Sequence, residues 1–443
     1  MLVAEVEVSR PLPAMAAVRP GGPPYERALV LVRLHHQPVG LVHLALDRAE
    51  LAPGALAAAV WEAAAGAIAS HLDQDGSRAP DRLEAGGLPV TGAPACRARR
   101  STFLSDPPSL TVVIPTRDRP ASLARCLDSV LACTYPASRF EVVVVDNVPT
   151  TDETRLRVEG YRPTGRVRYA REDRPGSASA RNRGLELVET DLVAFTDDDA
   201  IVDTDWLVAL AQGFEAADDV SAVTGLLLPR EMETPAQVWF EQYGGFSRGF
   251  ARQVYDLEHR PAGSPLYPYS AGVFGTGNNM AFRQAALAAI GGFDPALGNG
   301  TPALGGVDSE VLLRTILSGR RIVYEPTALA FHVHRADYAG LRRQVYSYGV
   351  GLSAYLLKTL MANPGLLGDF CRKVPSGLRF ALSPRSPKNA NKRGDYPPQL
   401  TWVELAGMLY GPLAYARSRR RFGPHPVPPD HRAEDRFLAA SGP

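Results

Sequence analysis

The sequence predicts an α/β fold in which a mostly parallel sheet is flanked by helices. Continuous apolar runs at residues 110–115 and 142–145 are typical of strands buried on both faces. Between these runs, apolar residues recur at helical spacing in Leu123, Leu127 and Val130. This strand–helix–strand order is typical of parallel sheets, which need a crossover between neighbouring strands.

The same alternation continues along the chain. A short strand is expected at residues 167–170, a helix at 179–189 and another apolar strand at 192–195. Because ligands of open α/β sheets bind beyond the carboxyl ends of the strands, the residues after each run are the candidates for a site. We expect this central unit to occupy residues 109–335.

Before the central unit we expect a small accessory unit, residues 1–75, and a linker, residues 76–108. Two β-rich segments, 28–34 and 39–46, are predicted to form a hairpin, and residues 55–72 an alanine-rich helix. The two histidines between the β segments, His35 and His36, have no cluster of partners in the sequence. They are interpreted as turn surface.

After the central unit, residues 336–443 are expected to form a helical extension with a disordered tail. The elements are a helix at 338–360, a polar loop at 383–398 and an apolar helix at 400–416 followed by arginines. The segment 400–421 either packs on the central unit or lies on an anionic membrane surface.

Charge and composition exclude several classes of protein. The chain has 443 residues, 48 basic and 47 acidic, so its net charge of +1 is not that of a nucleic-acid binder. Its four cysteines show no paired spacing for zinc or disulfides and are expected to be reduced thiols. No signal peptide and no stretch of ~20 apolar residues is evident. We expect a cytoplasmic protein, with peripheral contact at the inner face of the plasma membrane left open.

The strongest chemical signal is the triplet Asp197, Asp198 and Asp199 at the end of the apolar strand. Adjacent carboxylates repel one another, and a cation relieves the cost. Asp197 and Asp199 project to the same side of an extended chain and can face one Mg²⁺ or Mn²⁺ ion, which could bridge to a diphosphate. A solvated acidic turn is the alternative, which the preceding buried strand disfavours.

Successive motifs surround this triplet. They are residues 113–117 (VIPTR), 144–147 (VVDN), 176–184 (GSASARNRG), 277–283 (GNNMAFR), 291–294 (GGFD) and 305–310 (GGVDSE). In order and spacing they resemble the inverting family 2 glycosyltransferases, in an actinobacterial-like form with an extra N-terminal α/β unit. The resemblance implies a glycosyltransferase A fold, with one nucleotide-binding sheet joined to an acceptor-binding half.

The resemblance also implies roles for individual residues. Those expected to bind the nucleotide sugar are Pro115, Thr116, Asp146, Arg181, Asp197 and Asp198. Asp146 would accept a hydrogen bond from the base, and Arg181 would approach the phosphates. Asp197, Asp199 and His332 would hold the metal.

The resemblance assigns the catalytic base to Asp308, at the start of a helix, where it would deprotonate the acceptor hydroxyl. The family usually has a second acid before it, whereas this chain has Val307. Without the resemblance, Asp308 is a helix N-cap. On the acceptor side the candidates are Trp239, Asn279 and Glu310.

The leading hypothesis is a hexosyltransferase using a UDP- or dTDP-sugar, with Mg²⁺ or Mn²⁺, acting on a glycan, lipid-linked or natural-product acceptor in cell-envelope or polysaccharide biosynthesis. The alternatives are a catalytically weak nucleotide-sugar-binding protein and a membrane scaffold. Nucleotidyl transfer is a further alternative, but the chain has no basic triphosphate loop.

Overall fold

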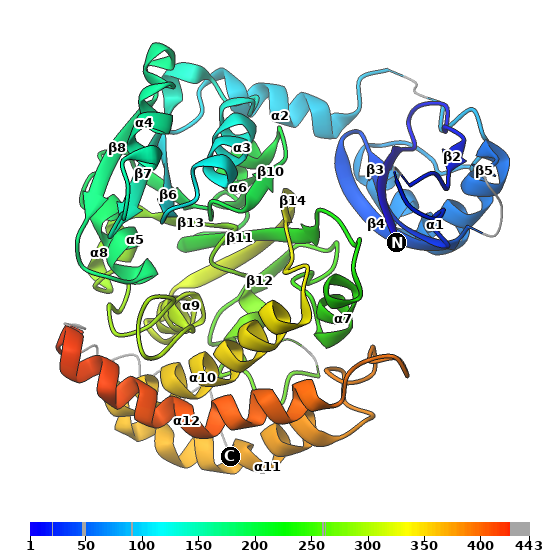
Figure 1. Cartoon of the computed structure of the whole chain (residues 1–443). Helices are drawn as coiled ribbons and strands as arrows, with labels where there is room; N and C mark the ends of the chain where they lie inside the picture. Colours follow the sequence, from blue (N-terminus) through cyan, green and yellow to red (C-terminus); the bar gives the residue numbers. More distant parts are fainter. Residues whose placement is uncertain (20, 47–49, 90–91, 259–260, 262, 426–443) are drawn as a thin grey trace.

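A large mixed sheet forms the centre of the computed structural model, which describes residues 1–425 except 20, 47–49, 90–91, 259–260 and 262 (Figure 1). Its nine strands follow the order β10-β14-β11-β13-β9-β6-β7-β8, with β12 paired to β14. Helices cover both faces of this sheet (Figure 1). The predicted α/β class is confirmed.

One half of the sheet is parallel. Its strands are β6 (Leu110–Thr116), β7 (Phe140–Asn147), β8 (Val167–Glu172) and β9 (Leu192–Phe195). The intervening helices are α3 (Pro120–Leu131), α4 (Glu153–Glu159) and α5 (Ser177–Leu185). The valines of β7 are fully buried because helices cover both faces, which explains why the strand lacks the alternation of a half-exposed sheet.

The other half mixes directions. Its strands are β10 (Ala200–Val202), β11 (Val220–Pro229), β12 (Gln253–Tyr255), β13 (Met280–Arg283) and β14 (Arg321–His332). Its helices are α6 (Trp206–Gly213), α7 (Pro235–Tyr243), α8 (Gln284–Ala289) and α9 (Val307–Leu317). β13 runs antiparallel to both β9 and β11 and so joins the two halves.

The first hundred residues form a separate small sheet of β1 (Leu2–Glu7), β3 (Arg27–Leu34) and β4 (Gln37–Ala45), with β2 (Met15–Ala16) pairing β5 (Glu50–Leu51). The hairpin and the helix α1 (Pro53–Gln74) follow the prediction. β1, parallel to β3, was not predicted. The expected linker contains another helix, α2 (Ala95–Ser105).

Two interpretations of the N-terminal region need correction. His35 is buried and in contact with other side chains, so its assignment to the turn surface is wrong. α1 is long and apolar enough, by length and composition, to cross a membrane, although no such stretch was expected. Its buried face, which includes Leu56, Val60 and Ile68, packs on the small sheet as a core helix does.

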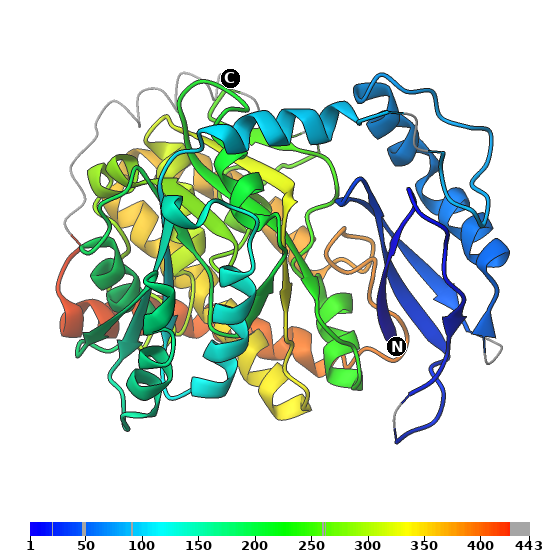
Figure 2. The same cartoon turned by 90° about the horizontal axis from the view of Figure 1, so that it is seen from above.

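The small sheet lies against the central unit beside β14 (Figures 1 and 2). Leu31 of β3 packs into the large core, and Arg33 donates to Asp203 at 2.7 Å. The amino group of Met1 donates to the carbonyl of Met232 at 2.9 Å. Apolar packing and charged contacts therefore both hold the two sheets together.

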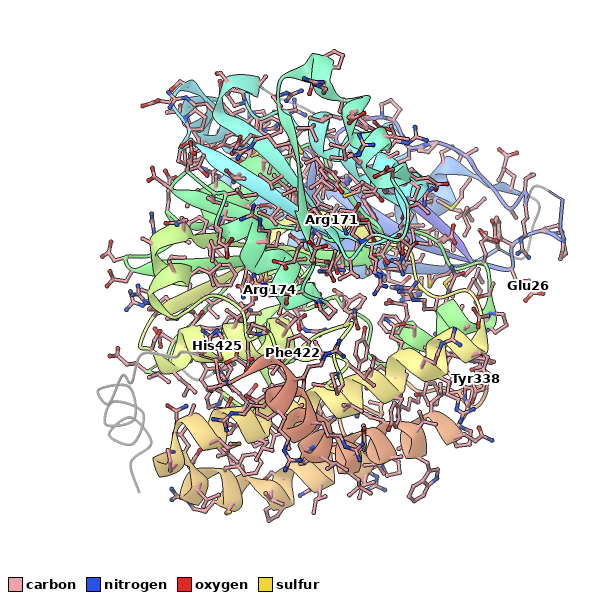
Figure 3. The ribbon with its side chains drawn as sticks, turned by 60° about the vertical axis from the view of Figure 1, so that its left-hand side comes forward. Glu26, Arg171, Arg174, Tyr338, Phe422 and His425 are labelled. Atoms are coloured by element: carbon pink, nitrogen blue, oxygen red, sulfur yellow. The ribbon has the colours of Figure 1, made fainter. Side chains whose placement is uncertain are left out.

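Three long helices form the C-terminal layer: α10 (Tyr338–Ala362), α11 (Leu367–Leu382) and α12 (Gln399–Phe422). Short 3₁₀ turns occur at Ala137–Arg139, Arg162–Thr164, Ala271–Phe274 and Pro364–Leu366. At the end of α12, beyond Phe422, His425 approaches the carbonyl of Gly291 at 2.8 Å (Figure 3). The tail expected to be disordered, residues 426–443, lies outside the described residues.

Glycines let α10 and α12 cross at backbone contact. A Cβ atom on Gly407 of α12 would lie 2.3 Å from the carbonyl oxygen of Tyr346, and one on Gly349 of α10 would lie 2.1 Å from that of Glu404. Both distances are far below van der Waals contact, so the two helices would have to separate to admit a side chain at either position.

We predict that Gly407→Ala lowers the free energy of unfolding by about 1–3 kcal/mol through overpacking, measured by urea denaturation. Gly368→Ala is the control, because a Cβ atom at Gly368 meets nothing within 4 Å in α11. The control should be neutral or slightly stabilising. Equal effects of the two substitutions would contradict the packing argument.

Candidate active site

The three carboxylates of the triplet lie directly after β9, beside the ends of β6 and β7. Asp198 turns inward, and its Oδ2 accepts a hydrogen bond from the Thr116 hydroxyl at 2.7 Å. The Asp198 side chain is 7% exposed, whereas that of Asp197 is 37% exposed. The middle carboxylate therefore fixes the loop after β6, whereas Asp197 is partly exposed and the Asp199 side chain is 15% exposed. Pro115 precedes Thr116 in the same strand.

Arg119, at the start of α3, contacts two of the three carboxylates. Its Nη1 lies 3.2 Å from Asp198 Oδ1 and 3.1 Å from Asp199 Oδ2. Arg335 adds a more distant contact, 3.9 Å from Asp199 Oδ2. The guanidinium groups reduce the repulsion within the triplet.

A chain of polar contacts leads from the triplet to α7. Nε2 of His332, the last residue of β14, lies 3.6 Å from Asp199 Oδ1. Its Nδ1 lies 3.0 Å from Nδ1 of His334, whose Nε2 lies 2.8 Å from Glu241 Oε1. His332 therefore presents one ring nitrogen to Asp199 and has the other held by a neighbour, as metal-binding histidines do.

Arg181 and a glycine backbone connect the triplet to Asp308. Arg181 Nη2 donates to Asp197 Oδ1 at 2.9 Å and to the carbonyl of Gly277 at 3.3 Å. The Gly277 N–H in turn donates to Asp308 Oδ2 at 2.9 Å. A Cβ atom on Gly277 would lie 2.8 Å from that of Asp308, so only glycine permits this approach.

Asp308 occupies the first turn of α9, whose N-cap is Gly306, so the N-cap assignment to Asp308 is wrong. Its negative charge is placed where the helix dipole favours an anion. The side chain of the preceding Val307 is buried in the apolar core, which accounts for the absence of an acid at that position.

Asp146 is the residue before the last in β7, the strand beside β6, and is fully buried. Its Oδ2 accepts a hydrogen bond from the Tyr169 hydroxyl at 3.1 Å, while its Oδ1 has no partner within the described part of the chain. The following Asn147 accepts a hydrogen bond from the Gly176 N–H at 2.9 Å and so holds the loop before α5. A buried acceptor without a partner is costly, and a ligand N–H would satisfy it.

Burial shifts the pKa values of the acidic groups upward. It raises the pKa of Asp198 to about 6, with a contribution from Asp199, and raises that of Asp197, against the effect of Arg181. Burial also raises the pKa of Asp146. Burial lowers the pKa of His332 to about 4, which leaves its imidazole neutral at pH 7. Carboxylates with excess negative charge and a neutral imidazole are a suitable ligand set for a divalent cation.

The acceptor-side candidates have different environments. Trp239 of α7 lies edge-on to Tyr338, with ring centroids 6.0 Å apart, and its indole N–H is buried without a partner in the described residues. The Asn279 amide is used inside the core, donating to the carbonyls of Leu226 and Ala328.

Glu310 is also committed to the interior. It is buried between Arg314 and Lys358; burial would raise its pKa, but the two cations hold the pKa below its ordinary value. Asn279 and Glu310 therefore serve packing within the core.

Several residues around this site were not identified from the sequence. Arg119, Tyr169 and Glu241 have contacts that depend on which strands and helices lie side by side. Of these three residues, only Arg119 could have been suspected from the sequence, because it lies in the loop that directly follows β6.

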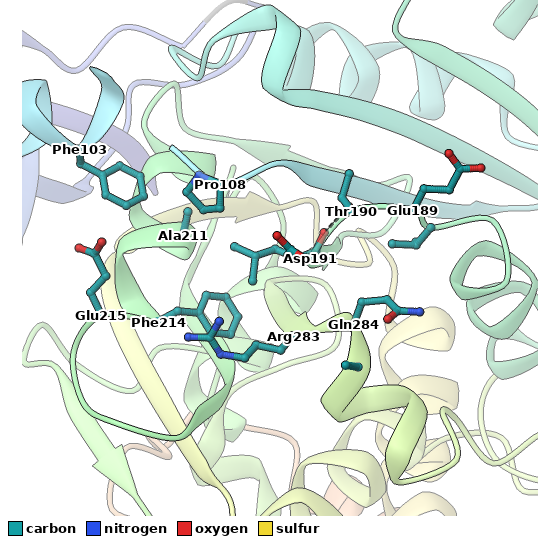
Figure 4. A pocket seen from close by; sticks show the side chains of 13 residues that line it. Phe103, Pro108, Glu189, Thr190, Asp191, Ala211, Phe214, Glu215, Arg283 and Gln284 are labelled. Atoms are coloured by element: carbon teal, nitrogen blue, oxygen red, sulfur yellow. Dashed lines mark hydrogen bonds between the residues drawn. The ribbon is translucent and has the colours of Figure 1, made fainter. Parts of the chain in front are cut away.

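A separate cavity of about 610 Å³ lies at the opposite edge of the sheet (Figure 4). It is lined by residues at the start of β9, such as Asp191, and by Arg283 and Phe214. Arg283 stacks over the Phe214 ring at 5.2 Å. Because the triplet follows the other end of β9, this cavity is not part of the candidate active site.

A mixed α/β sheet of this order, with an Asp-x-Asp element after one strand and a helix-borne aspartate beside it, defines a glycosyltransferase of the A-type fold. The family described as "Glycosyltransferase like family 2" matches residues 107–346, more than half of the chain. The chain belongs to this family.

Relatives of known name share the central unit. A glucosyl-dolichyl phosphate glucuronosyltransferase of Haloferax volcanii is 25% identical over 51% of this chain and 68% of its own length. A pre-mycofactocin glycosyltransferase of Mycobacterium tuberculosis is 29% identical over 52% of this chain and 43% of its own length, so this chain spans less than half of that relative.

Two solved structures are also similar. A mannosyltransferase of Pyrobaculum calidifontis in complex with GDP-Man and Mn²⁺ is 18% identical with a TM-score of 0.41, covering 78% of this chain and 92% of its own. S. aureus TarS residues 1–349 with UDP-GlcNAc is 16% identical with a TM-score of 0.42, covering 71% and 92%.

We predict that ionised Asp198 destabilises the metal-free protein. Its folded pKa of about 6 exceeds the ordinary value of 3.8, so this cost appears as the pH rises from about 4 to about 6 and is complete above pH 6. Asp198→Asn removes the charge and should therefore be more stable than the wild type at pH 7 in EDTA, by up to about 3 kcal/mol. The difference should vanish toward pH 4.

Urea denaturation of both proteins across this pH range measures the difference. Asp81→Asn is the control, because Asp81 is an exposed aspartate in the N-terminal unit. A stability difference between wild type and Asp198→Asn that does not change with pH would contradict the assigned pKa.

Proposed function

We propose that the chain transfers a sugar from a UDP- or dTDP-sugar to an acceptor hydroxyl, with a divalent metal and with inversion at the anomeric carbon. Two observations carry this proposal. Asp199 Oδ1 lies 3.6 Å from His332 Nε2, and Asp197, two residues earlier in the same triplet, is linked to Asp308 through Arg181 and Gly277. Donor-side and acceptor-side groups are thereby held next to each other.

The donor nucleotide is proposed to lie across the ends of β6 and β7. Asp146 Oδ1 accepts the N3–H of uracil or thymine, which satisfies its buried acceptor. Arg181, whose buried Nε also lacks a partner among the described residues, donates to a phosphate oxygen. The proposed site is also lined by Pro115, Thr116 and Asp198, and the Thr116–Asp198 hydrogen bond holds their two segments together.

Asp197, Asp199 and His332 are the proposed ligands of Mg²⁺ or Mn²⁺. When bound, the cation supplies charge that stabilises the departing nucleoside diphosphate. Asp308 accepts the proton of the attacking hydroxyl, and its two backbone hydrogen bonds, from Gly277 and Ser309, keep its carboxylate oriented. A single displacement from the side opposite the leaving group inverts the anomeric carbon.

We predict metal-dependent stabilisation of the protein by UDP or dTDP in a thermal-shift assay. At about 100 times the dissociation constant the ligand adds about 2.7 kcal/mol of stability. GDP should stabilise it less, and EDTA or Asp199→Ala should abolish the effect. Asp308→Asn should keep donor binding but lower turnover by about 10²–10⁴-fold.

Asp81→Asn again serves as the control, with unchanged binding and turnover. A flat response to all three nucleotides would reject the donor site. Normal binding with no turnover by the wild type on any acceptor tested would favour a nucleotide-sugar-binding protein.

We further propose that the acceptor is lipid-linked and that the C-terminal layer lies on a membrane surface. Leu367, Val374, Leu378 and Leu382 recur on one face of α11 and are 41–55% exposed. On one face of α12, Trp402, Leu409 and Leu413 are 71%, 85% and 50% exposed. Arg417, Arg419, Arg420 and Arg421 follow on α12, and such helices bind anionic lipid surfaces.

We predict that the protein floats with anionic phospholipid vesicles and that the double variant Leu378→Glu and Leu409→Glu does not. The added charges oppose burial in the apolar layer of the lipid. Leu156→Glu, at a 57% exposed position on α4, is the control and should float as the wild type does. Wild-type protein that stays with the soluble fraction would contradict the membrane surface.

A further inference from the structure

Four side chains that bind metals in many proteins converge in the N-terminal unit, away from the triplet. They are His35, His71, Asp75 and Cys96, whose ligand atoms all lie within 4.8 Å of one another. The His35, His71 and Asp75 side chains are only 6%, 10% and 1% exposed, and Cys96 is buried. This cluster is referred to below as the His-Asp-Cys cluster.

Three separate segments supply the cluster. His35 lies in the two-residue turn of the β3–β4 hairpin, where both His35 and His36 have positive φ, 54° and 70°. Such turns most often contain asparagine, aspartate and glycine, and histidine is among the other residues that adopt a positive φ. His71 and Asp75 lie one helical turn apart at the end of α1, and Cys96 lies in the first turn of α2.

Short distances separate the ligand atoms of the four residues. His35 Nδ1 lies 3.2 Å from His71 Nε2, 3.0 Å from Asp75 Oδ2 and 3.5 Å from Cys96 Sγ. Asp75 Oδ2 lies 3.3 Å from His71 Nε2 and 2.9 Å from Cys96 Sγ. One nitrogen, sulfur or oxygen atom of each residue therefore points to a common centre.

We propose that the His-Asp-Cys cluster binds one Zn²⁺ ion as a structural site, through His35 Nδ1, His71 Nε2, Asp75 Oδ2 and Cys96 Sγ. Zinc in closed structural sites takes four such ligands in a tetrahedron. This site has no residue in common with the proposed catalytic metal site and does not depend on the proposed transfer reaction.

The spacing of the ligand atoms matches a zinc tetrahedron. Zn–N, Zn–O and Zn–S bonds of ~2.0–2.3 Å place neighbouring ligand atoms about 3.3–3.6 Å apart. Five of the six distances within the cluster, 2.9–3.5 Å, differ from this range by a few tenths of an ångström, and the sixth, from His71 Nε2 to Cys96 Sγ, is within 4.8 Å. The Cys96–Asp75 distance is the shortest and would lengthen as the thiol proton leaves.

Charge also balances in the proposed site. Zn²⁺ is neutralised by one thiolate and one carboxylate, and the two imidazoles bind as neutral ligands, with one proton released from Cys96. The second oxygen of Asp75, Oδ1, accepts the Cys96 backbone N–H at 2.6 Å and lies 3.6 Å from Arg99. These contacts to Oδ1 leave Oδ2 to face the metal. Hydrogen bonds from groups that do not bind the metal commonly orient metal ligands in this way.

A cysteine beside histidine and aspartate could instead be a catalytic nucleophile. A nucleophile must be reached by its substrate, whereas Cys96 is 6% exposed and enclosed by the other three side chains. The burial therefore favours a closed structural site.

Zinc at this place would connect the N-terminal unit to the loop that follows the Asp triplet. Arg33, two residues before His35, binds Asp203, and Arg100, four residues after Cys96, binds Asp205. Asp203 and Asp205 lie between β10 and α6, directly after Asp197–Asp199 and β10. A metal that fixes the hairpin turn against α2 would thus fix both arginines against this loop.

We predict one equivalent of zinc per chain in the full-length, untagged protein after dialysis, measured by inductively coupled plasma mass spectrometry. In protein stripped by chelator, titration with Co²⁺ should produce a thiolate-to-cobalt charge-transfer band and the visible bands of tetrahedral cobalt. The band reports sulfur ligation, so metal at the carboxylate site, which has no cysteine ligand, cannot produce it.

Cys96→Ser and His71→Ala should lose the zinc equivalent, and Cys96→Ser should lose the charge-transfer band. Three controls should keep both signals: His36→Ala in the same turn, Cys371→Ser at the exposed cysteine, and Asp199→Ala in the carboxylate triplet. Circular dichroism verifies that each variant is folded.

A folded wild-type protein that gives no charge-transfer band with Co²⁺ and retains no zinc would overturn the proposal and leave the cluster as a hydrogen-bonded network. Persistence of the band in Cys96→Ser would overturn it as well. Because the first result is read on the wild type, the proposal remains falsifiable even where a variant fails to fold.

Discussion

The concentration of negative charge at the end of β9 is the constraint on which the rest of the site depends. Three consecutive aspartates follow a strand that is buried on both faces, and two of them, Asp197 and Asp198, have raised pKa values. The protein reduces this repulsion with the guanidinium groups of Arg119, directly before α3, and Arg181 from α5, and it places the neutral imidazole of His332 from β14 beside Asp199. The strand order is what brings these distant elements together.

The C-terminal layer supports the position of Asp308. Asp308 is held beside Arg181 because α9 begins at a glycine pair that packs on α10: a Cβ atom on Gly306 would lie 2.5 Å from the carbonyl oxygen of Gly351. One turn further, Lys358 of α10 contacts Glu310 of α9 in the core. α10 therefore supports the helix that carries the proposed base, and α12 supports α10.

The N-terminal unit contacts the loop that follows the triplet and β10. Its contacts with Asp203 and Asp205 reach the loop after β10, so the accessory unit supports the segment that carries the carboxylates. Glycosyl transfer requires donor and acceptor to be held in fixed relative positions, and the barrier falls when that order is already present before binding. Both extensions thus contribute to a preorganised site.

The strands of the central unit can be predicted from local sequence. The runs 112–115 of β6 and 142–145 of β7 predict buried strands, because no polar residue interrupts them, and the loops after parallel strands meet at one edge of the sheet. Asp146 and the aspartate triplet could be placed there without coordinates for that reason. Local periodicity also predicts the hairpin of β3 and β4 and the helices α1, α10 and α12, whereas α11 was not predicted.

Contacts between side chains of different elements could not be predicted in this way, because they depend on how the whole chain folds. His35 was assigned to a turn surface because its partners, His71, Asp75 and Cys96, lie 36 to 61 residues away in the sequence. Glu310 was considered for the acceptor side, yet its cations come from its own helix and from α10. Periodicity reports which face of an element is buried, whereas contacts between elements depend on chain paths that local sequence does not encode.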